Sequence, residues 1–381
     1  MNTCSVTSVA DKKSRQMLHL AKKYNDKVIV IAVGCLVDSL NIKNDKIVDD
    51  SDKKESIPGV DYIVSNEEKN NLSNIVSAIF KDKLHIKDEK NSFSNDRIRS
   101  FIKIQDGCNQ FCSYCLIPYL RGNISSRNDE DIIDEIEVKS KNGVKEIVLT
   151  GIHISSFSLD RHNLQYENEG AIDISRHALI DILKKVALVC GIERIRLGSL
   201  EPRIINDYFL NEIINDKNLN EKFCANFCLS LQSGCDKTLK NMNRHYTTKD
   251  FEEAVILIRK YMPNATLTTD VIVGFPGETD DDFKESLEFV KKIRFYNPNI
   301  FPFSKRKGTN AYDMKNQLSN KEKHERSKIM ILECEKISKE IEDEYNKINN
   351  PILVEEIIEE NGIRYGIGYT KEYIKRKVKI N

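Results

Sequence analysis

The sequence predicts an α/β protein whose centre is a parallel sheet curled into an incomplete (β/α)6 barrel. Short strand-like runs alternate with helical stretches between residues 101 and 303, as in a parallel sheet whose strands are joined by helices. A loop with three cysteines directly follows the first run, and chemistry in such sheets gathers at the carboxyl ends of the strands. The strand-like runs are 101–105, 145–150, 194–199, 227–232, 266–274 and 299–303.

Helical stretches separate these runs. We predict helices at 129–142, 248–261 and 281–293, and a longer one at 320–348 after the last strand. Asn128 stands at the N-cap position of the first helix, and Gly143 stands where a helix commonly ends. The strict alternation of strand and helix is the reason for expecting a parallel sheet.

The parts outside the barrel define three further regions. Residues 1–80 predict a partial α/β domain, with a helix at 10–25 and a buried strand at 27–34, and residues 81–99 predict a polar linker. The barrel and its last helix occupy 100–348, and alternating strands at 349–381 predict part of a small β-module. Because both ends interrupt a pattern, we expect both terminal domains to be truncated.

Composition limits the class of protein. A chain of 381 residues is too long for one ordinary core. Lys and Arg together number 59, as do Asp and Glu, so any nucleic-acid binding must come from local patches. No apolar run is long enough for a membrane span, and the N-terminus lacks a signal peptide, so we expect a cytoplasmic protein without membrane contact.

The stretch DGCNQFCSYC (106–115) predicts an iron–sulfur site with one open corner. Its C-x3-C-x2-C spacing supplies three thiolates, enough for three irons of a [4Fe–4S] cube. A structural zinc or a simple ferredoxin would need a fourth ligand, and none lies nearby. An iron left open can chelate the amine and carboxylate of S-adenosyl-L-methionine, which one electron then cleaves to a 5′-deoxyadenosyl radical.

Other polar residues have plainer interpretations. We expect Cys190, Cys224, Cys228, Cys235 and Cys334 to be small buried thiols, and we prefer this to a metal-binding pair in CANFC (224–228). Gly274 and Gly277 should form a turn that needs positive φ, rather than a phosphate loop. We expect His153 to be a satisfied structural histidine, with donation to a substrate as the alternative.

The motifs resemble those of radical S-adenosylmethionine enzymes, and among these the methylthiotransferases, with details similar to the MtaB branch. The resemblance covers essentially the whole chain. The motifs that carry it are NTCSVT, GCLVDS, IQDGCNQFCSYCLIPYLRG, EIVLTGIHI, RLGSLEP, LSLQSGCDKTLKNMNRHYT, TTDVIVGFPGET and FPFSKRKGTNA. It implies a TIM-like radical SAM barrel, a second [4Fe–4S] cluster on an N-terminal methylthiotransferase domain, and a C-terminal TRAM module that binds RNA.

The resemblance also implies site residues. Cys108, Cys112 and Cys115 would hold the radical cluster, while Cys4 and Cys35 would hold the auxiliary cluster, whose third ligand this chain lacks. Where relatives tend to have histidines, this chain has Asn226 and Cys228, so it departs from the family pattern at these two positions. Tyr114 would lie near the adenine, and the candidates for cofactor or substrate contacts at the barrel mouth are Gly151, Glu201, Gln232, Ser233 and Asp270.

RNA binding needs local positive charge, because phosphates dominate the affinity. Two basic stretches fall at the expected barrel mouth and a third in the β-module, where alternation places three lysines on one face and Arg376 on the other. The candidate residues are Arg121, Arg127, Lys305, Arg306, Lys307, Lys375, Lys377 and Lys379.

The resemblance implies a tRNA methylthiotransferase that acts on C2 of N6-threonylcarbamoyladenosine next to the anticodon. It would need an electron donor such as a flavodoxin or ferredoxin, and a sulfur donor. The nearest alternative is a sister enzyme acting on N6-isopentenyladenosine in tRNA or on an aspartate of a ribosomal protein. An alternative of another class is a truncated, non-catalytic protein that binds RNA or a cluster.

Overall fold

The computed structural model describes every residue except 6, 41, 44–45, 48–56, 67, 81–96, 349 and 381. The chain divides into two compact units. The predicted linker at 81–99 lies mostly outside the described residues. Unit 1 holds Met1–Phe93, Phe111–Asn123 and Ser304–Met314, and unit 2 holds Ser94–Gln110, Ile124–Phe303 and Lys315–Asn381.

Unit 2 is built on parallel strands that follow one another in chain order. β6 pairs with β8, β8 with β9, β10 with β11, and β12 with β13, all in parallel. Single parallel bridges, Leu200 with Leu229 and Gln232 with Val271, join these sheets. The result is the predicted incomplete α/β barrel. The strands are β6 (Arg99–Asp106), β7 (Ser125–Ser126), β8 (Glu146–Gly151), β9 (Arg194–Leu197), β10 (Asn226–Cys228), β11 (Thr266–Thr268), β12 (Asp270–Val273) and β13 (Asn299–Pro302).

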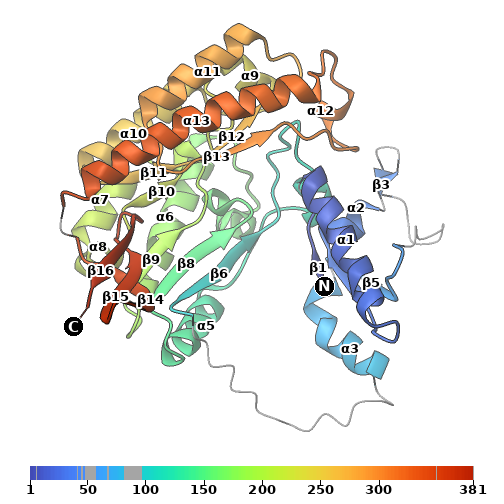
Figure 1. Cartoon of the computed structure of the whole chain (residues 1–381), viewed down its shortest axis with the longest axis horizontal. Coiled ribbons are helices and arrows are strands. Elements are labelled where there is room, and N and C mark those ends of the chain that lie inside the picture. The colour runs from blue at the N-terminus through green and yellow to red at the C-terminus, as the bar shows by residue number, and fades with distance from the viewer. Residues whose placement is uncertain are drawn as a thin grey trace. The chain divides into compact units, whose positions relative to one another are not determined.

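Helices cover the outer face of these strands (Figure 1). Along β6, Ile102 and Ile104 are fully buried in the core, whereas Phe101 and Lys103 are exposed on the opposite face. This alternation follows from the strand period of two residues and leaves one face of each strand for the barrel interior. The helices are α5 (Asp129–Lys141), α6 (Glu169–Ala187), α7 (Asp207–Asn215), α8 (Lys217–Lys222), α9 (Asp236–Asn241), α10 (Thr248–Tyr261), α11 (Asp280–Ile293) and α13 (Asn320–Tyr345), with 3-10 turns η2 (Ile154–Ser156), η3 (Leu159–His162) and η4 (Pro202–Ile204).

One predicted strand is two strands in the structure. Thr269 separates β11 from β12, because its hydroxyl donates to the Leu229 carbonyl at 2.5 Å and accepts the Leu231 N–H at 2.9 Å. The Thr269 side chain therefore makes hydrogen bonds where the backbone of a regular strand would make them. As a consequence Asp270 begins β12, instead of lying in the middle of a single long strand.

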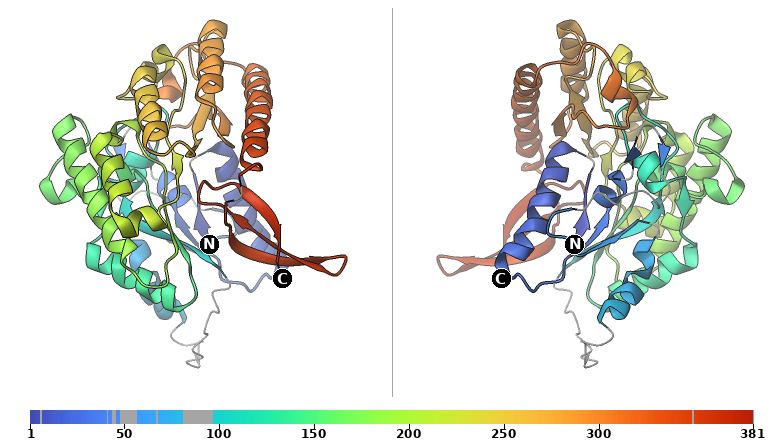
Figure 2. Two further views of the ribbon diagram at one scale, coloured as in Figure 1. Left: turned by 90° about the vertical axis from the view of Figure 1, so that its left-hand side faces the viewer. Right: turned by 90° about the vertical axis from the view of Figure 1, so that its right-hand side faces the viewer.

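After α13 the chain forms an antiparallel meander, the predicted β-module (Figure 2). Arg194 of β9 donates to the carbonyls of Tyr369 at 2.5 Å and Thr370 at 2.9 Å. The Arg196 guanidinium lies 3.7 Å from the centre of the Tyr373 ring. Such cation–π contacts are attractive, so two arginines of one barrel strand hold the meander. Its strands are β14 (Leu353–Glu360), β15 (Ile363–Tyr369) and β16 (Lys375–Lys379).

Unit 1 contains a parallel sheet in the order β1-β2-β5. The Thr7 hydroxyl caps α1 by accepting the Ala10 N–H at 3.1 Å, and Leu18 of α1 is fully buried in a cluster with Val30 and Ala32. The unit's elements are β1 (Asn2–Thr3), α1 (Ser8–Tyr24), β2 (Ile31–Gly34), α2 (Cys35–Ser39), β3 (Ile42–Lys43), β4 (Lys46–Ile47), β5 (Tyr62–Val64), η1 (Glu68–Asn71), α3 (Leu72–Phe80), α4 (Ile117–Arg121) and α12 (Asn310–Asp313).

Some predicted boundaries need correction. The strand expected from residue 27 begins at Ile31, since the Val30 N–H donates to the Asp61 carboxylate at 2.7 Å rather than to a neighbouring strand. The last long helix ends at Tyr345 instead of residue 348. Asn128 occupies the N-cap of α5 without a side-chain capping bond, whereas Gly143, at φ +88°, follows that helix as predicted.

Candidate functional site

The two later cysteines of the three-cysteine motif lie in unit 1, on one tight turn. The Cys115 N–H donates to the Cys112 carbonyl at 2.9 Å, and both thiols are partly exposed. The turn leads into α4, where the buried side chains of Leu116 and Leu120 form a cluster with Cys35. Unit 1 therefore brings the carboxyl half of the motif beside α2, which begins at Cys35. Tyr114, inside the turn, is partly exposed.

The first cysteine of the motif, Cys108, lies in unit 2, in the loop that leaves β6. Gly107 before it has a φ of +69°, a left-handed conformation that favours glycine. The Gln105 amide donates to the Gly107 carbonyl at 2.8 Å, and the Gln110 amide donates to the Tyr166 carbonyl at 3.0 Å. These bonds fix the backbone on both sides of Cys108, whose thiol is partly exposed.

The chemistry of these cysteines fits an iron–sulfur cluster. A cluster needs thiol groups that iron can reach, and the three thiols of the motif are partly exposed. Burial instead raises the pKa of Cys224, in the barrel wall, to about 12. Within the described parts of the chain, no three His, Cys, Asp or Glu side chains are gathered so as to hold a single metal ion. The assignment of Cys108, Cys112 and Cys115 to one cluster therefore depends on their spacing in the chain.

Cys4 and Cys35 follow neighbouring parallel strands of unit 1. β1 pairs in parallel with β2, and Thr3 lies opposite Gly34. The carboxyl ends of parallel strands meet at one edge of a sheet, so the two cysteines start from the same edge. Ser14 of α1 holds the Cys4 backbone, accepting its N–H at 3.1 Å and donating to its carbonyl at 3.2 Å. Cys4 is exposed, whereas Cys35 is only 4% exposed.

Two of the residues predicted at the barrel mouth, Gly151 and Glu201, have structural roles within unit 2. A Cβ at Gly151 would lie 2.7 Å from the Gln105 carbonyl oxygen, so a larger residue would push β8 away from β6. Glu201 is 2% exposed, and its carboxylate accepts the Tyr166 hydroxyl and the Arg203 Nε–H, each at 2.8 Å. These bonds orient Tyr166 and Arg203, two residues that sequence reasoning missed.

Gln232 and Asp270 come together in the structure. Gln232 has a φ of +65°, unusual for a residue other than glycine, and its N–H donates to the Asp270 carbonyl at 2.9 Å. The Asp270 side chain is partly exposed and accepts the Asn299 amide at 3.0 Å. Ser233 is 1% exposed, which places its side chain within the protein rather than on an open surface. Strained backbone of the Gln232 kind is often found at functional sites.

The prediction that His153 is a satisfied structural histidine is wrong. Both ring nitrogens are buried and make no hydrogen bond to any described residue, although the residue as a whole is partly exposed. The ring packs edge-on against Tyr166, with centroids 4.8 Å apart. Burial, assisted by the positive charges of Arg244 and Arg203, lowers the pKa of His153 to about 3. The imidazole is therefore neutral at pH 7.

The isolated cysteines follow the prediction in part. Cys224, Cys235 and Cys334 are buried, but Cys190 is exposed, because it lies in a surface turn after α6. Cys228 is partly exposed, with its Sγ 3.2 Å from the Ser199 hydroxyl.

Asn226 makes hydrogen bonds of its own inside unit 2. Its amide donates to the Thr266 hydroxyl at 2.9 Å and accepts from Arg196 at 3.3 Å. The turn at Gly274 and Gly277 has φ values of +71° and +80°, as predicted.

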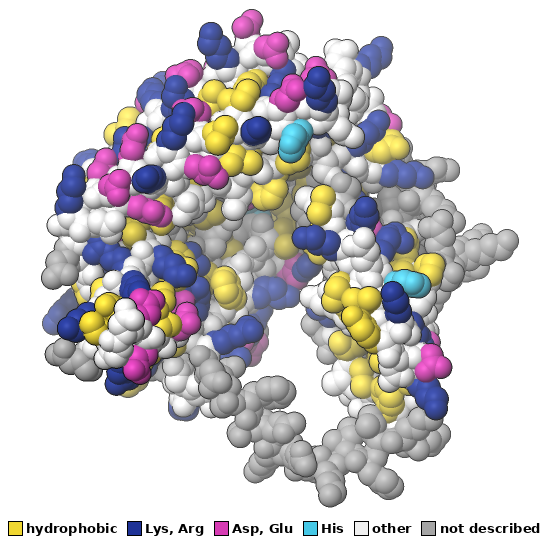
Figure 3. All heavy atoms as spheres, in the orientation of Figure 1, with side chains coloured by type: hydrophobic (Ala, Val, Ile, Leu, Met, Phe, Trp, Pro, Cys, Tyr) yellow, Lys and Arg dark blue, Asp and Glu magenta, His cyan; other side chains and the backbone are white. Residues whose placement is uncertain are grey.

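The cations predicted to bind RNA differ in their contacts. Arg127 pairs with Glu135 at 2.7 Å, and Arg306 pairs with Asp11 at 3.2 Å. Both guanidinium groups are therefore already paired with a carboxylate of their own unit. Lys377 is exposed and pairs with Glu360, while Arg121 is partly exposed. Figure 3 shows cations mixed with acids over α13 and the meander. The exposed lysines of the predicted set are Lys305, Lys307, Lys375, Lys377 and Lys379.

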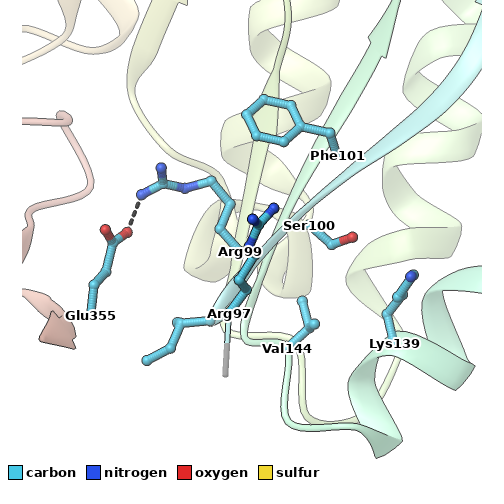
Figure 4. A pocket seen from close by; sticks show the side chains of 8 residues that line it. Arg97, Arg99, Ser100, Phe101, Lys139, Val144 and Glu355 are labelled. Atoms are coloured by element: carbon cyan, nitrogen blue, oxygen red, sulfur yellow. Dashed lines mark hydrogen bonds and ion pairs between the residues drawn. The ribbon is translucent and has the colours of Figure 1, made fainter. Parts of the chain in front are cut away.

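A hollow that the sequence did not predict lies in unit 2 beside the start of β6 (Figure 4). It measures about 550 Å³, and Arg97, Arg99 and Lys139 line it together with Phe101, which is 61% exposed. Arg99 pairs with Glu355 of β14, so this hollow also marks a junction between the barrel and the meander.

Comparisons with known proteins follow this geometry. The family model of the Radical SAM superfamily matches residues 102–290. This range runs from within β6 to within α11 and contains the cysteine loop. A solved structure of the radical S-adenosylmethionine methyltransferase TsrM from Kitasatospora setae is similar in fold, with a TM-score of 0.52 at 12% identity. The similarity covers 82% of this chain and 64% of that chain.

Full-length relatives are more informative. "Threonylcarbamoyladenosine tRNA methylthiotransferase MtaB" of Bacillus subtilis is 33% identical over 98% of this chain and 80% of its own length. The protein of the same name from Aquifex aeolicus is 33% identical, over 99% and 86%. "tRNA-2-methylthio-N(6)-dimethylallyladenosine synthase" of Endomicrobium trichonymphae is 32% identical, over 100% and 87%.

The barrel, the cysteine loop and the matching superfamily model together define a radical SAM enzyme, and a [4Fe–4S] cluster and S-adenosyl-L-methionine are the cofactors of that class. Within this superfamily the chain belongs to the MtaB-type methylthiotransferase family, and it is a tRNA methylthiotransferase. In the described portion of the chain, no helix combines the length and apolar character needed to span a bilayer.

Proposed function

We propose that the protein adds a methylthio group to C2 of N6-threonylcarbamoyladenosine, next to the anticodon of tRNA, in the cytoplasm. The observation that carries this proposal is the three-cysteine loop at the end of β6, which leads into α4, where Leu116 and Leu120 pack against Cys35. The names of the two relatives with 33% identity support the threonylcarbamoyl substrate. The relative with 32% identity supports a second candidate, N6-dimethylallyladenosine (N6-isopentenyladenosine) in tRNA.

In this proposal the reaction replaces the hydrogen at C2 by an S–CH3 group. Cys108, Cys112 and Cys115 would hold a [4Fe–4S] cluster, which would supply the electron for cleavage of S-adenosylmethionine, and the hydrogen from C2 would leave as part of 5′-deoxyadenosine. Cys4 and Cys35 would provide two ligands of an auxiliary cluster, and no other cysteine precedes Cys108 in this chain. A second S-adenosylmethionine supplies the methyl group, an external donor the sulfur, and a flavodoxin or ferredoxin the electrons.

The chain's own residues bind and orient the reactants. Tyr114 lies within the cluster turn, where its ring can cover the adenine of the cofactor. Gln232 and Asp270, which are joined by a backbone hydrogen bond, contact cofactor or substrate, while Gly151 allows the close approach of β8 to β6. Lys305 and Lys307 in unit 1, and the lysines of β16 in unit 2, contact tRNA phosphates.

Anaerobic reconstitution tests this function directly. With reductant and S-adenosylmethionine, the protein should form 5′-deoxyadenosine, and Cys115→Ala should abolish its formation. With tRNA that carries N6-threonylcarbamoyladenosine, nucleoside mass spectrometry should detect the 2-methylthio product. Product formation only on N6-dimethylallyladenosine would instead establish the second candidate. The absence of 5′-deoxyadenosine from the iron-loaded protein would contradict both.

A further inference from the structure

A segment from the end of the barrel reaches both cysteine sites of unit 1. We call Ser304–Met314 the strap; it belongs to unit 1 although it follows β13. At one end the Ala311 N–H donates to the carbonyl of Ser113, which lies between Cys112 and Cys115, at 2.7 Å. At the other end Arg306 Nη2 donates to the hydroxyl of Ser5, the residue after Cys4, at 2.5 Å.

The strap is folded back on itself between these two contacts. The Thr309 hydroxyl donates to the Arg306 carbonyl at 2.7 Å, and Thr309 is 4% exposed. Gly308, with a φ of +87°, takes a left-handed conformation that closes the turn. A turn that is bonded internally transmits position from one end to the other. Arg306 and Ala311 are therefore joined by an internally bonded turn.

Ser5 is the centre of the network that Arg306 joins. It is fully buried, with its hydroxyl 3.4 Å from the Asp11 carboxylate and 3.3 Å from the Ser39 hydroxyl. Ser39 ends α2, the helix that begins at Cys35. The network thus connects the residue after Cys4 to both α1 and α2.

The Arg306 guanidinium is placed where its charge acts strongly. Its side chain is 12% exposed, and the Asp11 carboxylate with which it pairs is 18% exposed. The Nε–H of Arg306 is buried and makes no hydrogen bond to any described residue. A buried donor without an acceptor is costly, so this N–H is available to an anionic group that arrives with the cofactors. Fields in such partly desolvated surroundings are weakly screened.

We propose that Arg306 is a positioning residue for methylthio transfer. Through the strap it holds the Cys4 edge of the sheet and the Cys112–Cys115 turn in a fixed relation, and it places a positive charge beside the auxiliary site. This inference rests on the proposed function. Loss of the connection should leave cleavage of S-adenosylmethionine possible, but should misplace the two sites relative to each other.

The test compares Arg306→Gln, Arg306→Lys and the matched control Arg15→Gln. Arg15 of α1 pairs with the same Asp11 carboxylate at 2.7 Å, but its side chain is 44% exposed. The measurements are iron per chain, 5′-deoxyadenosine, methylthiolated nucleoside, and the reduction potential of each cluster by EPR-monitored titration. Wild type with both clusters should contain about eight irons.

In Arg306→Gln the methylthio product formed per 5′-deoxyadenosine should fall by about tenfold or more, because small misplacements of reacting groups cost this much. The potential of the auxiliary cluster should shift to more negative values, because a positive charge is lost beside it. Arg306→Lys should recover the reduction potential of the auxiliary cluster, but only part of the product formed per 5′-deoxyadenosine. Arg15→Gln should match wild type in the reduction potential and in the product formed per 5′-deoxyadenosine.

The proposal would be overturned if Arg306→Gln left both the product formed per 5′-deoxyadenosine and the reduction potential of the auxiliary cluster unchanged. So would a parallel loss of 5′-deoxyadenosine, product and thermal stability in both Arg306 variants, since that pattern indicates a purely structural contact. A wild-type protein with only about four irons would also overturn it, because there would be no auxiliary cluster to position. Failure of the proposed function is distinct, because wild type itself would then form no methylthiolated nucleoside.

Discussion

At the scale of single residues, buried polar groups differ in whether the protein itself satisfies them. The Glu201 carboxylate accepts two side-chain donors, whereas Arg203 Nη2 and both His153 nitrogens are buried without a partner among the described residues. These unsatisfied atoms lie close to the Cys108 side of the barrel, since Tyr166 contacts both His153 and Gln110. Unpaired buried groups are uncommon, and they mark where a ligand or a strained arrangement belongs.

His153 should make stability depend on pH. Its folded pKa of about 3 lies below the ordinary value of 6.5, so the unfolded chain binds more protons between these values. Stability should therefore rise with pH up to about 6.5, by at most about 1.4 kcal/mol per unit and less because the residue is partly exposed. Urea unfolding of the apoprotein at pH 5 and 7 should show this slope reduced in His153→Leu. The exposed His324→Leu is the control, and an equal slope in both variants would contradict the assignment.

At the scale of elements, the turn after β12 depends on a residue from a later helix. The buried Glu278 carboxylate accepts the Gly274 N–H at 2.9 Å and Arg326 Nη1 of α13 at 2.6 Å. Burial raises the pKa of Glu278 and Arg326 opposes this. The GFPGE pattern predicted a turn from local rules, because only glycine easily adopts positive φ. Its partner in α13 could not be predicted, because it lies far away in the sequence.

Removal of Arg326 should therefore destabilise unit 2. In Arg326→Met the Glu278 carboxylate stays buried without its counter-charge, which typically costs about 3 to 5 kcal/mol. The double variant Glu278→Gln with Arg326→Met should recover a large part of this loss, because no buried charge is left unpaired. Denaturant unfolding monitored by circular dichroism measures both. A loss below about 1 kcal/mol in the single variant would show that Glu278 is protonated or hydrated instead.

At the scale of the whole molecule, positive and negative charges balance, but in strand β16 of the meander the lysines gather on one face. In β16 the residues alternate, with Lys375, Lys377 and Lys379 exposed and Arg376 only partly so. The Arg376 guanidinium donates to the Ile348 carbonyl at 2.6 Å. The three lysines therefore face solvent, while Arg376 bonds β16 to the segment between α13 and β14.

Charge reversal of this face should separate RNA binding from radical chemistry. The triple variant Lys375→Glu, Lys377→Glu and Lys379→Glu should bind tRNA about tenfold or more weakly and with a smaller dependence on salt, because phosphate contacts are lost. Formation of 5′-deoxyadenosine without tRNA should not change. The control is reversal of the exposed lysines Lys321, Lys328 and Lys339 of α13. Equal tRNA affinity of the two triple variants would remove the meander from the RNA-binding surface.

The sequence by itself determined the order of strands and helices, the cysteine spacing and the glycine turn, because these depend on local periodicity and on short-range backbone preferences. It predicted α10 at 248–261 with the observed bounds. Only the tertiary structure decided which polar groups are paired. Arg306 reaches Ser5 and Asp11, Thr269 interrupts a strand, and the ring nitrogens of His153 are buried without a partner among the described residues. Such pairings join residues that are distant in the chain, so no local pattern records them.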